Sequence, residues 1–295
     1  MMALLVLLLV ACQAPADWRP QTAAHLTARA VDWVEHTPDI GENVRCAMSC
    51  HTTHPYLIVR PLLGPIPPGD AYFAIRAKID ARVGATTPFY GTPGSAKERE
   101  SFGSEAVLNA ATFALADRAT GVARPITKAA FARMWERQRA DGGFDWLDFG
   151  LQPFEAGGDW GATLAALAAG VVGERGPSVD RLVAYLRGRL PRMTAHERVG
   201  MLRAGATLRA LLDDRERAAL VAELEAQRGR DGGWGDAYTT AYATLALCEN
   251  GRPDARGLAW LRAHRRDDGS WSGHGYMADA ATAYAALALS TCPSP

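Results

Sequence analysis

A short turn occurs three times in the second half of the chain, and this repeat constrains the fold more than any other feature. The copies span residues 138–144, 227–234 and 264–271, and each contains Asp-Gly and ends on Phe or Trp. Each copy follows an amphipathic segment and precedes a segment rich in Ala, Thr and Leu. Repeats of this kind form helix pairs that bury their apolar faces only by stacking on their neighbours.

The spacing of the copies predicts a ring of helix pairs. The turn aspartates are separated by 90 and 37 residues, so the longer interval fits two units, one of which has lost its turn. Residues 178–190 and 194–211 supply the helices of that degenerate unit. Helices made of Ala, Thr and Leu belong inside, whereas charged helices such as 127–138 and 254–265 have one apolar stripe and belong outside. We therefore predict an all-α protein, an α/α toroid of about five to six helix pairs.

The turns also resemble those of a known family. The pattern Gln-x(2–5)-Gly-x-Trp is similar to the QW repeat of squalene–hopene and other terpene cyclases, and residues 256–261 resemble the segment that precedes that repeat. The resemblance covers residues 104–292, although Phe144 replaces Trp in one copy and Arg265 replaces Gln in another. It implies that the Gln and Trp side chains are structural and tie each outer helix to its neighbour.

Acid-initiated cyclase chemistry is not expected of this toroid. The resemblance implies an Asp-x-Asp-Asp cluster at the start of an inner helix, and the sequence contains none. The Asp-Asp-x-x-Asp magnesium motif of ionising terpene synthases is absent from the sequence too. Three predicted inner helices start with one acid each, Asp159, Asp236 and Asp279. An Asp at a helix start typically caps the first turn, so we expect N-caps and not proton donors.

A different motif lies in the N-terminal third. Cys46-Ala-Met-Ser-Cys50-His51 resembles the attachment signal for c-type haem, with three residues between the cysteines in place of the usual two. We predict one covalent haem c, held by thioethers at Cys46 and Cys50, with His51 as the metal ligand. A disulfide, a partial zinc site and a chance cluster are the alternatives. Residues 52–63 resemble bacterial proteins that join this motif to a squalene-cyclase-like toroid.

The sequence leaves the sixth iron ligand open. A Met or His ligand favours electron transfer, and an open position favours ligand binding or oxygen chemistry. Met48 and His54 lie so close to the motif that reaching the opposite haem face needs an awkward chain path. The other candidates are His25, His36, Met134, Met193, Met201 and Met277.

The N-terminus predicts export. Residues 3–11 are uncharged and apolar, too short to span a bilayer but of the length of a signal-peptide core. Leu-Val-Ala-Cys12 resembles the lipobox of bacterial lipoproteins, which implies lipidation of Cys12; a plain secretory signal and a short membrane tether are the alternatives. Haem is attached to c-type sites on the exported side of the bacterial membrane, so the two signals agree. We expect a periplasmic lipoprotein anchored in the membrane, with Gln13 favouring the outer membrane.

These signals divide the chain into a signal peptide (1–12), a tether (13–21), an N-terminal helical region (22–103) and the toroid (104–292). The formal net charge is zero, so the chain lacks the basic character that a nucleic-acid partner requires.

Two functional hypotheses follow. In one, the haem exchanges electrons with a redox partner protein. In the other, the toroid cavity binds an isoprenoid- or quinone-like apolar molecule, as an enzyme or as a binding protein. Whether the chain is an enzyme stays open. The predicted cavity lining is Trp160, Asp236, Tyr238, Tyr242, Tyr276, Asp279 and Tyr284.

Two further cysteines, Cys248 and Cys292, fall near the ends of the last two predicted inner helices. A disulfide needs Cα atoms within about 7 Å of each other, so a bridge is feasible only if the chain bends back before Pro293. We expect buried free thiols, with the bridge as the alternative.

Overall fold

The computed structural model describes residues 17–36 and 48–293. The apolar N-terminal run, Cys12 and Cys46 lie outside these described residues. Across the described ranges the secondary structure consists of twelve α-helices and four short 3-10 helices, with no β-strand. No helix within them is both long and apolar enough to cross a bilayer.

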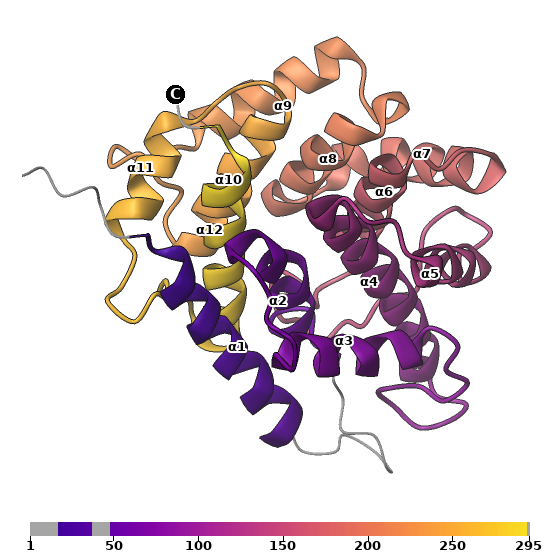
Figure 1. Ribbon diagram of the computed structural model, residues 1–295. Helices are drawn as coiled ribbons and strands as arrows, with labels where there is room; N and C mark the ends of the chain where they lie inside the picture. Colours follow the sequence, from indigo (N-terminus) through magenta and orange to yellow (C-terminus); the bar gives the residue numbers. More distant parts are fainter. Residues whose placement is uncertain (1–16, 37–47, 294–295) are drawn as a thin grey trace, which may run out of the picture.

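Six inner helices form a closed ring (Figure 1). Each packs against the next along the chain, and the first, α2, also packs against the last, α12. The predicted all-α toroid is therefore confirmed. The inner helices are α2 (Thr53–Val59), α4 (Ala96–Thr120), α6 (Gly158–Val172), α8 (Ala195–Thr207), α10 (Ala237–Glu249) and α12 (Ala278–Thr291).

The other six α-helices surround this ring, and most pack on an inner helix next to them in the chain. They are α1 (Arg19–His36), α3 (Ala71–Arg82), α5 (Pro125–Glu136), α7 (Pro177–Arg189), α9 (Asp214–Ala226) and α11 (Ala255–Ala263). The degenerate unit predicted at 178–211 corresponds to α7 and α8. The 3-10 helices are Arg60–Leu63, Leu190–Arg192, Arg209–Leu211 and Gly275–Met277.

The N-terminal region completes the ring and does not stand beside it. The boundary expected at residue 104 falls inside α4, which begins at Ala96. Figure 1 shows α1 next to α12 at the opposite end of the chain, and the two helices are in contact. Leu26 and Val34 on the inner face of α1 are buried, whereas Trp33 is only partly buried.

The three turns share one hydrogen-bonding pattern. In each, the Asp side chain accepts the backbone N–H two residues later, and the distances are 3.0, 3.2 and 3.0 Å at Asp141, Asp231 and Asp268. The indole of Trp234 donates to the carbonyl of Leu224 at 2.9 Å, and that of Trp271 donates to the preceding outer helix at 2.7 Å. The structural role that the resemblance implied for Trp is confirmed.

The prediction that Gln227 is the structural glutamine of the second turn was wrong, because Arg228 has that position. Backbone bonds put Gln138 and Arg228 in the same place in their turns, six residues before the aromatic residue. Gln138 donates to the carbonyl of Gly142 at 3.0 Å, and Arg228 donates to that of Gly232 at 3.1 Å. Gln227 lies one residue too early for this role. An arginine replaces Gln because its guanidinium also offers N–H donors to the turn.

The third turn docks on α1. The middle glycine of each turn has a positive φ and lies close to an outer helix: Gly142 to α7, Gly232 to α11 and Gly269 to α1. A Cβ on Gly269 would lie 2.8 Å from the backbone of α1. The hydroxyl of Thr22 donates to the carbonyl of Gly269 at 2.7 Å. Helix α1 therefore occupies the outer position that α7 and α11 hold at the earlier turns.

The three lone acids play different parts. Asp236 is the N-cap of α10 and accepts the backbone N–H of Thr239 at 2.7 Å, as expected. Asp159 and Asp279 lie inside the first turns of α6 and α12 and are not caps. Each is buried and pairs with one arginine, at 2.8 and 2.9 Å respectively. Sequence position alone could not separate a cap from an ion-paired acid two residues further into the helix.

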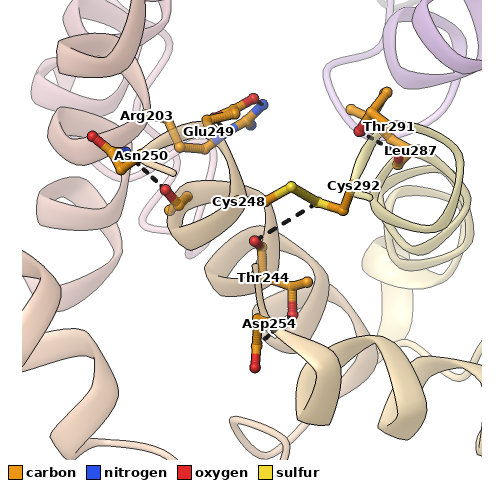
Figure 2. The surroundings of a disulfide bond; sticks show 10 residues. Arg203, Thr244, Cys248, Glu249, Asn250, Asp254, Leu287, Thr291 and Cys292 are labelled. Carbon is orange, nitrogen blue, oxygen red and sulfur yellow. Dashed lines mark hydrogen bonds and ion pairs between the residues drawn. A yellow bond between two sulfur atoms is a disulfide. The ribbon is translucent and has the colours of Figure 1, made fainter. Parts of the chain in front are cut away.

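A disulfide joins the ends of α10 and α12. Cys248 and Cys292 are bonded, with their Cα atoms 5.8 Å apart (Figure 2). The expectation of free thiols was wrong. Helix α12 ends at Thr291, and the extended backbone at Cys292 turns its side chain back toward α10.

Candidate functional site

A pocket of about 180 Å³ lies beside Cys50 and His51, and we call it the Cys50 pocket. Its polar side chains include Cys50, His51 and Glu155. Most of the remaining wall is apolar. The aromatic residues that line it are Trp33, Phe89, Tyr90, Trp146 and Phe149.

His51 is held between two aromatic rings. Trp33 from α1 and Tyr276 each meet the imidazole edge to face, with ring centroids 4.9 and 5.0 Å away. Burial lowers the pKa of His51 to about 4, and the carboxylate of Asp279 opposes this shift. The imidazole is therefore neutral at pH 7, which is the form that binds a metal.

A chain of polar contacts fixes which nitrogen of His51 has the proton. The hydroxyl of Thr52 donates to Asp279 at 2.9 Å, so it can only accept from the imidazole Nδ1, 3.1 Å away. Asp279 in turn pairs with Arg29 of α1. The Nδ1 atom is thus protonated, and Nε2 keeps its lone pair with no hydrogen-bond partner among the described residues. Metal-binding histidines are commonly oriented through the other ring nitrogen in this way.

Glu155 adds a candidate metal ligand that the sequence analysis did not identify. It comes from a small hairpin in which Leu151 and Glu155 exchange two backbone hydrogen bonds. The Cys50 thiol donates to the Glu155 carboxylate at 3.2 Å. One ligand atom from each of Cys50, His51 and Glu155 lies within 4.8 Å of the others. Cysteine, histidine and glutamate side chains are suitable ligands for a metal ion, the cysteine once its thiol has lost its proton.

Burial controls the protonation of this group. It raises the pKa of the Cys50 thiol well above its usual value, and the neighbouring Glu155 carboxylate adds to the shift. Burial also raises the pKa of Glu155, while the hydrogen bond from Cys50 opposes that shift. At neutral pH, Cys50 is therefore a thiol and not a thiolate.

The candidates for the sixth iron ligand lie in different parts of the structure. Met48 lines the Cys50 pocket, although its closeness in sequence had argued against it. His54 is buried elsewhere and its Nδ1 lies 2.6 Å from the hydroxyl of Thr112. Met277 lines a second pocket. None of the other five candidates, all of them in the described part of the chain, lines the Cys50 pocket.

The centre of the toroid contains an aromatic cluster. Phe154, fully buried, lies with its ring centroid 4.6 Å from Trp160, 5.2 Å from Tyr238 and 6.5 Å from Tyr284. The sequence analysis did not single out Phe154. It lies in a segment with no helical periodicity, and only the hairpin that ends at Glu155 brings it to the axis.

A second pocket, of about 410 Å³, borders this cluster, and we call it the Asp236 pocket. Of the residues predicted to line a toroid cavity, Asp236, Tyr238 and Tyr242 are among its walls. Trp160, Asp279 and Tyr284 are not among them, and Tyr276 contacts His51 instead.

His196 links α8 to the aromatic cluster. Its Nε2 lies 2.8 Å from the hydroxyl of Tyr238, and its ring stacks on Tyr242 with centroids 4.8 Å apart. Burial and, to a smaller extent, the positive charge of Arg203 lower the pKa of His196 to about 3. Arg203 is itself buried and paired with Glu249 at 2.8 Å.

Part of the chain is similar to a terpene cyclase. Over 83 residues it is 42% identical to labda-7,13-dienyl diphosphate synthase of Streptomyces clavuligerus, and the alignment covers 24% of this chain. The chain spans only 15% of that enzyme. No protein-family profile matches the chain. Together with the closed helical ring, this similarity indicates a terpene-cyclase-like, all-helical toroid.

Proposed function

We propose that this protein is an exported redox protein that binds one haem c covalently. Cys46 and Cys50 supply the thioethers and His51 ligates the iron. The toroid serves as the rigid scaffold. The bound group supplies one-electron transfer, and a redox partner protein receives or delivers the electron. The lipid anchor at Cys12 and the periplasmic location belong to the same proposal.

The orientation of His51 is the observation that supports this proposal most directly. The contacts through Thr52 and Asp279 put the proton on Nδ1 and leave Nε2 available next to Cys50. An imidazole kept neutral by burial and oriented by a carboxylate is typical of a metal ligand.

The Cys50 pocket supplies suitable surroundings. Aromatic and aliphatic side chains together form most of its wall, as suits the apolar face of a porphyrin, and Cys50 is held as a thiol. Thioether formation adds the S–H of a thiol across a vinyl C=C bond, so the thiol form is the one that is needed. The pocket volume of about 180 Å³ is below the roughly 300–1,000 Å³ that encloses a whole ligand. It takes part of the haem, which the covalent bonds retain.

The disulfide between Cys248 and Cys292 supports export. Disulfides persist in oxidising compartments such as the periplasm and are rare in the cytosol. A cyclase role receives less support from the lone acids. Asp236 caps a helix, while Asp159 and Asp279 pair with arginines.

The test is a spectrum of the full chain produced in bacteria with the haem-attachment machinery. We expect a reduced α-band that survives acid–acetone extraction. Cys50→Ser should leave at most one thioether, and His51→Ala should change or abolish the ligand-field spectrum. His274→Ala, which removes an exposed histidine that does not line the Cys50 pocket, should keep the wild-type haem content.

A wild-type protein that contains no haem, or whose haem is removed by acid–acetone extraction, would overturn the proposal. The same preparation tests the alternative of a directly bound metal ion. Zinc or iron in the haem-free protein, lost in Glu155→Gln, would assign Cys50, His51 and Glu155 to such a metal site instead.

A further inference from the structure

The Asp236 pocket is separate from the haem site proposed above. A single hairpin lies between them: Gln152 and Pro153 line the Asp236 pocket, while Glu155 lines the Cys50 pocket. The volume of about 410 Å³ is within the range of sites that hold a small organic molecule. Its other walls come from α8, α9 and α10, from the turn before α10, and from the segment before α12, which supplies Gly273, His274 and Met277.

Three aromatic rings form rigid walls of this pocket. The indole N–H of Trp234 is bonded to the carbonyl of Leu224, and the Tyr238 hydroxyl is bonded to His196. Tyr238 and Tyr242 are stacked, with centroids 5.6 Å apart and an angle of 15° between the rings. Because the polar atoms of Trp234 and Tyr238 have partners, these two side chains offer mainly their π surfaces to a ligand. The guanidinium of Arg228, paired with Asp254, lies over one face of Trp234, 4.0 Å from the ring centroid, so only the opposite face of the indole can meet a ligand. Arg203 lies 5.0 Å from the ring centroid of Tyr242, and its charge is balanced by Glu249.

The pocket has an unbalanced negative charge. Asp236 lines it and takes part in no ion pair among the described residues. One of its carboxylate oxygens accepts the N–H of Thr239, which leaves the other without a hydrogen-bond partner in the same set of residues. No Lys or Arg lines the pocket. The nearby Arg198 and Arg203 are paired with Glu223 and Glu249.

Aromatic faces combined with a carboxylate select a cation. A quaternary or protonated amine is attracted by the ring quadrupoles and by the carboxylate, whereas a neutral molecule of the same shape gains only apolar burial. Phosphate and diphosphate groups are recognised by Arg and Lys, and none is available here. We propose that the Asp236 pocket binds an organic ammonium ion with an apolar body.

The first test is titration calorimetry of the full chain with benzyltrimethylammonium, with benzyl alcohol as the neutral comparison. We expect binding of the cation and at least tenfold weaker binding of the alcohol. Asp236→Asn should weaken binding of the cation about tenfold, because it removes the charge while Asn still caps α10. Asp213→Asn, which changes the N-cap of α9 away from the pocket, should leave the affinity unchanged.

A second variant tests the location. Ala195 lines the pocket and is exposed, so Ala195→Trp should fill the space and abolish binding without lowering the melting temperature. Ala222→Trp, on an exposed position of α9 that does not line the pocket, is the matched control. Equal affinity for the alcohol and the cation, or full affinity in Asp236→Asn, would overturn the proposal. So would a wild-type protein that does not bind the cation. None of these results depends on haem.

Discussion

The two parts of the ring reach the same architecture by different means. From α5 to α12, three turns share the same internal hydrogen bond, and they are also bonded to a further outer helix, α7, α11 and α1 respectively. From α1 to α4 no such turn occurs in the described residues, yet α2 closes the inner ring and α1 receives the third turn. The repeated part holds the ring together through its turns, and one of these turns also lines the Asp236 pocket. The part without repeats supplies Cys50 and His51 to the other pocket.

The largest effect is expected at the disulfide, which secures the end of the repeated part. Cys248 and Cys292 close a loop with a sequence separation of 44 residues. Loss of such a bridge costs about 4 kcal/mol of unfolding free energy through the entropy of the unfolded chain. We expect this loss in the Cys248→Ser/Cys292→Ser double variant, measured by urea unfolding. Reduced wild-type protein should behave like the double variant, and equal stability with and without the bridge would contradict the prediction.

The next effect tests the turn that joins the two parts. Trp271 is almost fully buried, and Trp271→Phe removes its bond to the carbonyl of Leu261 and some packing volume. We expect a loss of about 2–3 kcal/mol, of which the unpaired carbonyl accounts for roughly 1. Trp135→Phe is the control, because Trp135 is only partly buried. A similar loss in both variants would show that the turn has no special role.

Acid should weaken both parts of the ring alike. Burial lowers the pKa of His54 in α2 and of His196 in α8 to about 3, and Arg76 and Arg203 respectively add to the shift. The unfolded chain binds these protons near pH 6.5, so stability falls as the pH decreases from about 6.5 toward 3.

Each of these two histidines should lower the unfolding free energy by roughly 2 kcal/mol when the pH decreases from 7 to 5. The measurement is the unfolding free energy at both pH values for the wild type, His54→Asn and His196→Asn. Each variant should lose part of the pH dependence. An effect at His196 alone would mean that α2 opens locally and is not a firm part of the ring.

The smallest effect tests the closure at α1. Thr22→Val keeps the shape of a fully buried side chain but removes its hydrogen bond to Gly269. We expect a loss of about 1–1.5 kcal/mol by urea unfolding. Thr27→Val, in the same helix but partly exposed and with a longer contact of 3.3 Å to Tyr56, should cost less. No change at Thr22 would mean that α1 contributes little to ring stability.

The sequence by itself determined the helical ring. Its small-residue and amphipathic segments alternate, and this local periodicity already assigns each helix to the inside or the outside. It also identified the tie made by Trp234 and the cap made by Asp236, since both depend on neighbours within about ten residues. Its errors at Gln227, Asp159 and Asp279 are shifts of one or two residues, because register within a turn or a helix start depends on side-chain packing.

Only the tertiary structure decided what surrounds the candidate sites. Glu155 meets Cys50 because ring closure brings α2 next to a hairpin 105 positions later in the chain. Asp279 orients His51 across the junction of α2 and α12, and Phe154 reaches the toroid axis from a segment without periodicity. Cys292 meets Cys248 because the chain turns after α12. Local sequence patterns report which face of a helix is buried, but contacts between distant segments follow from how the whole ring closes.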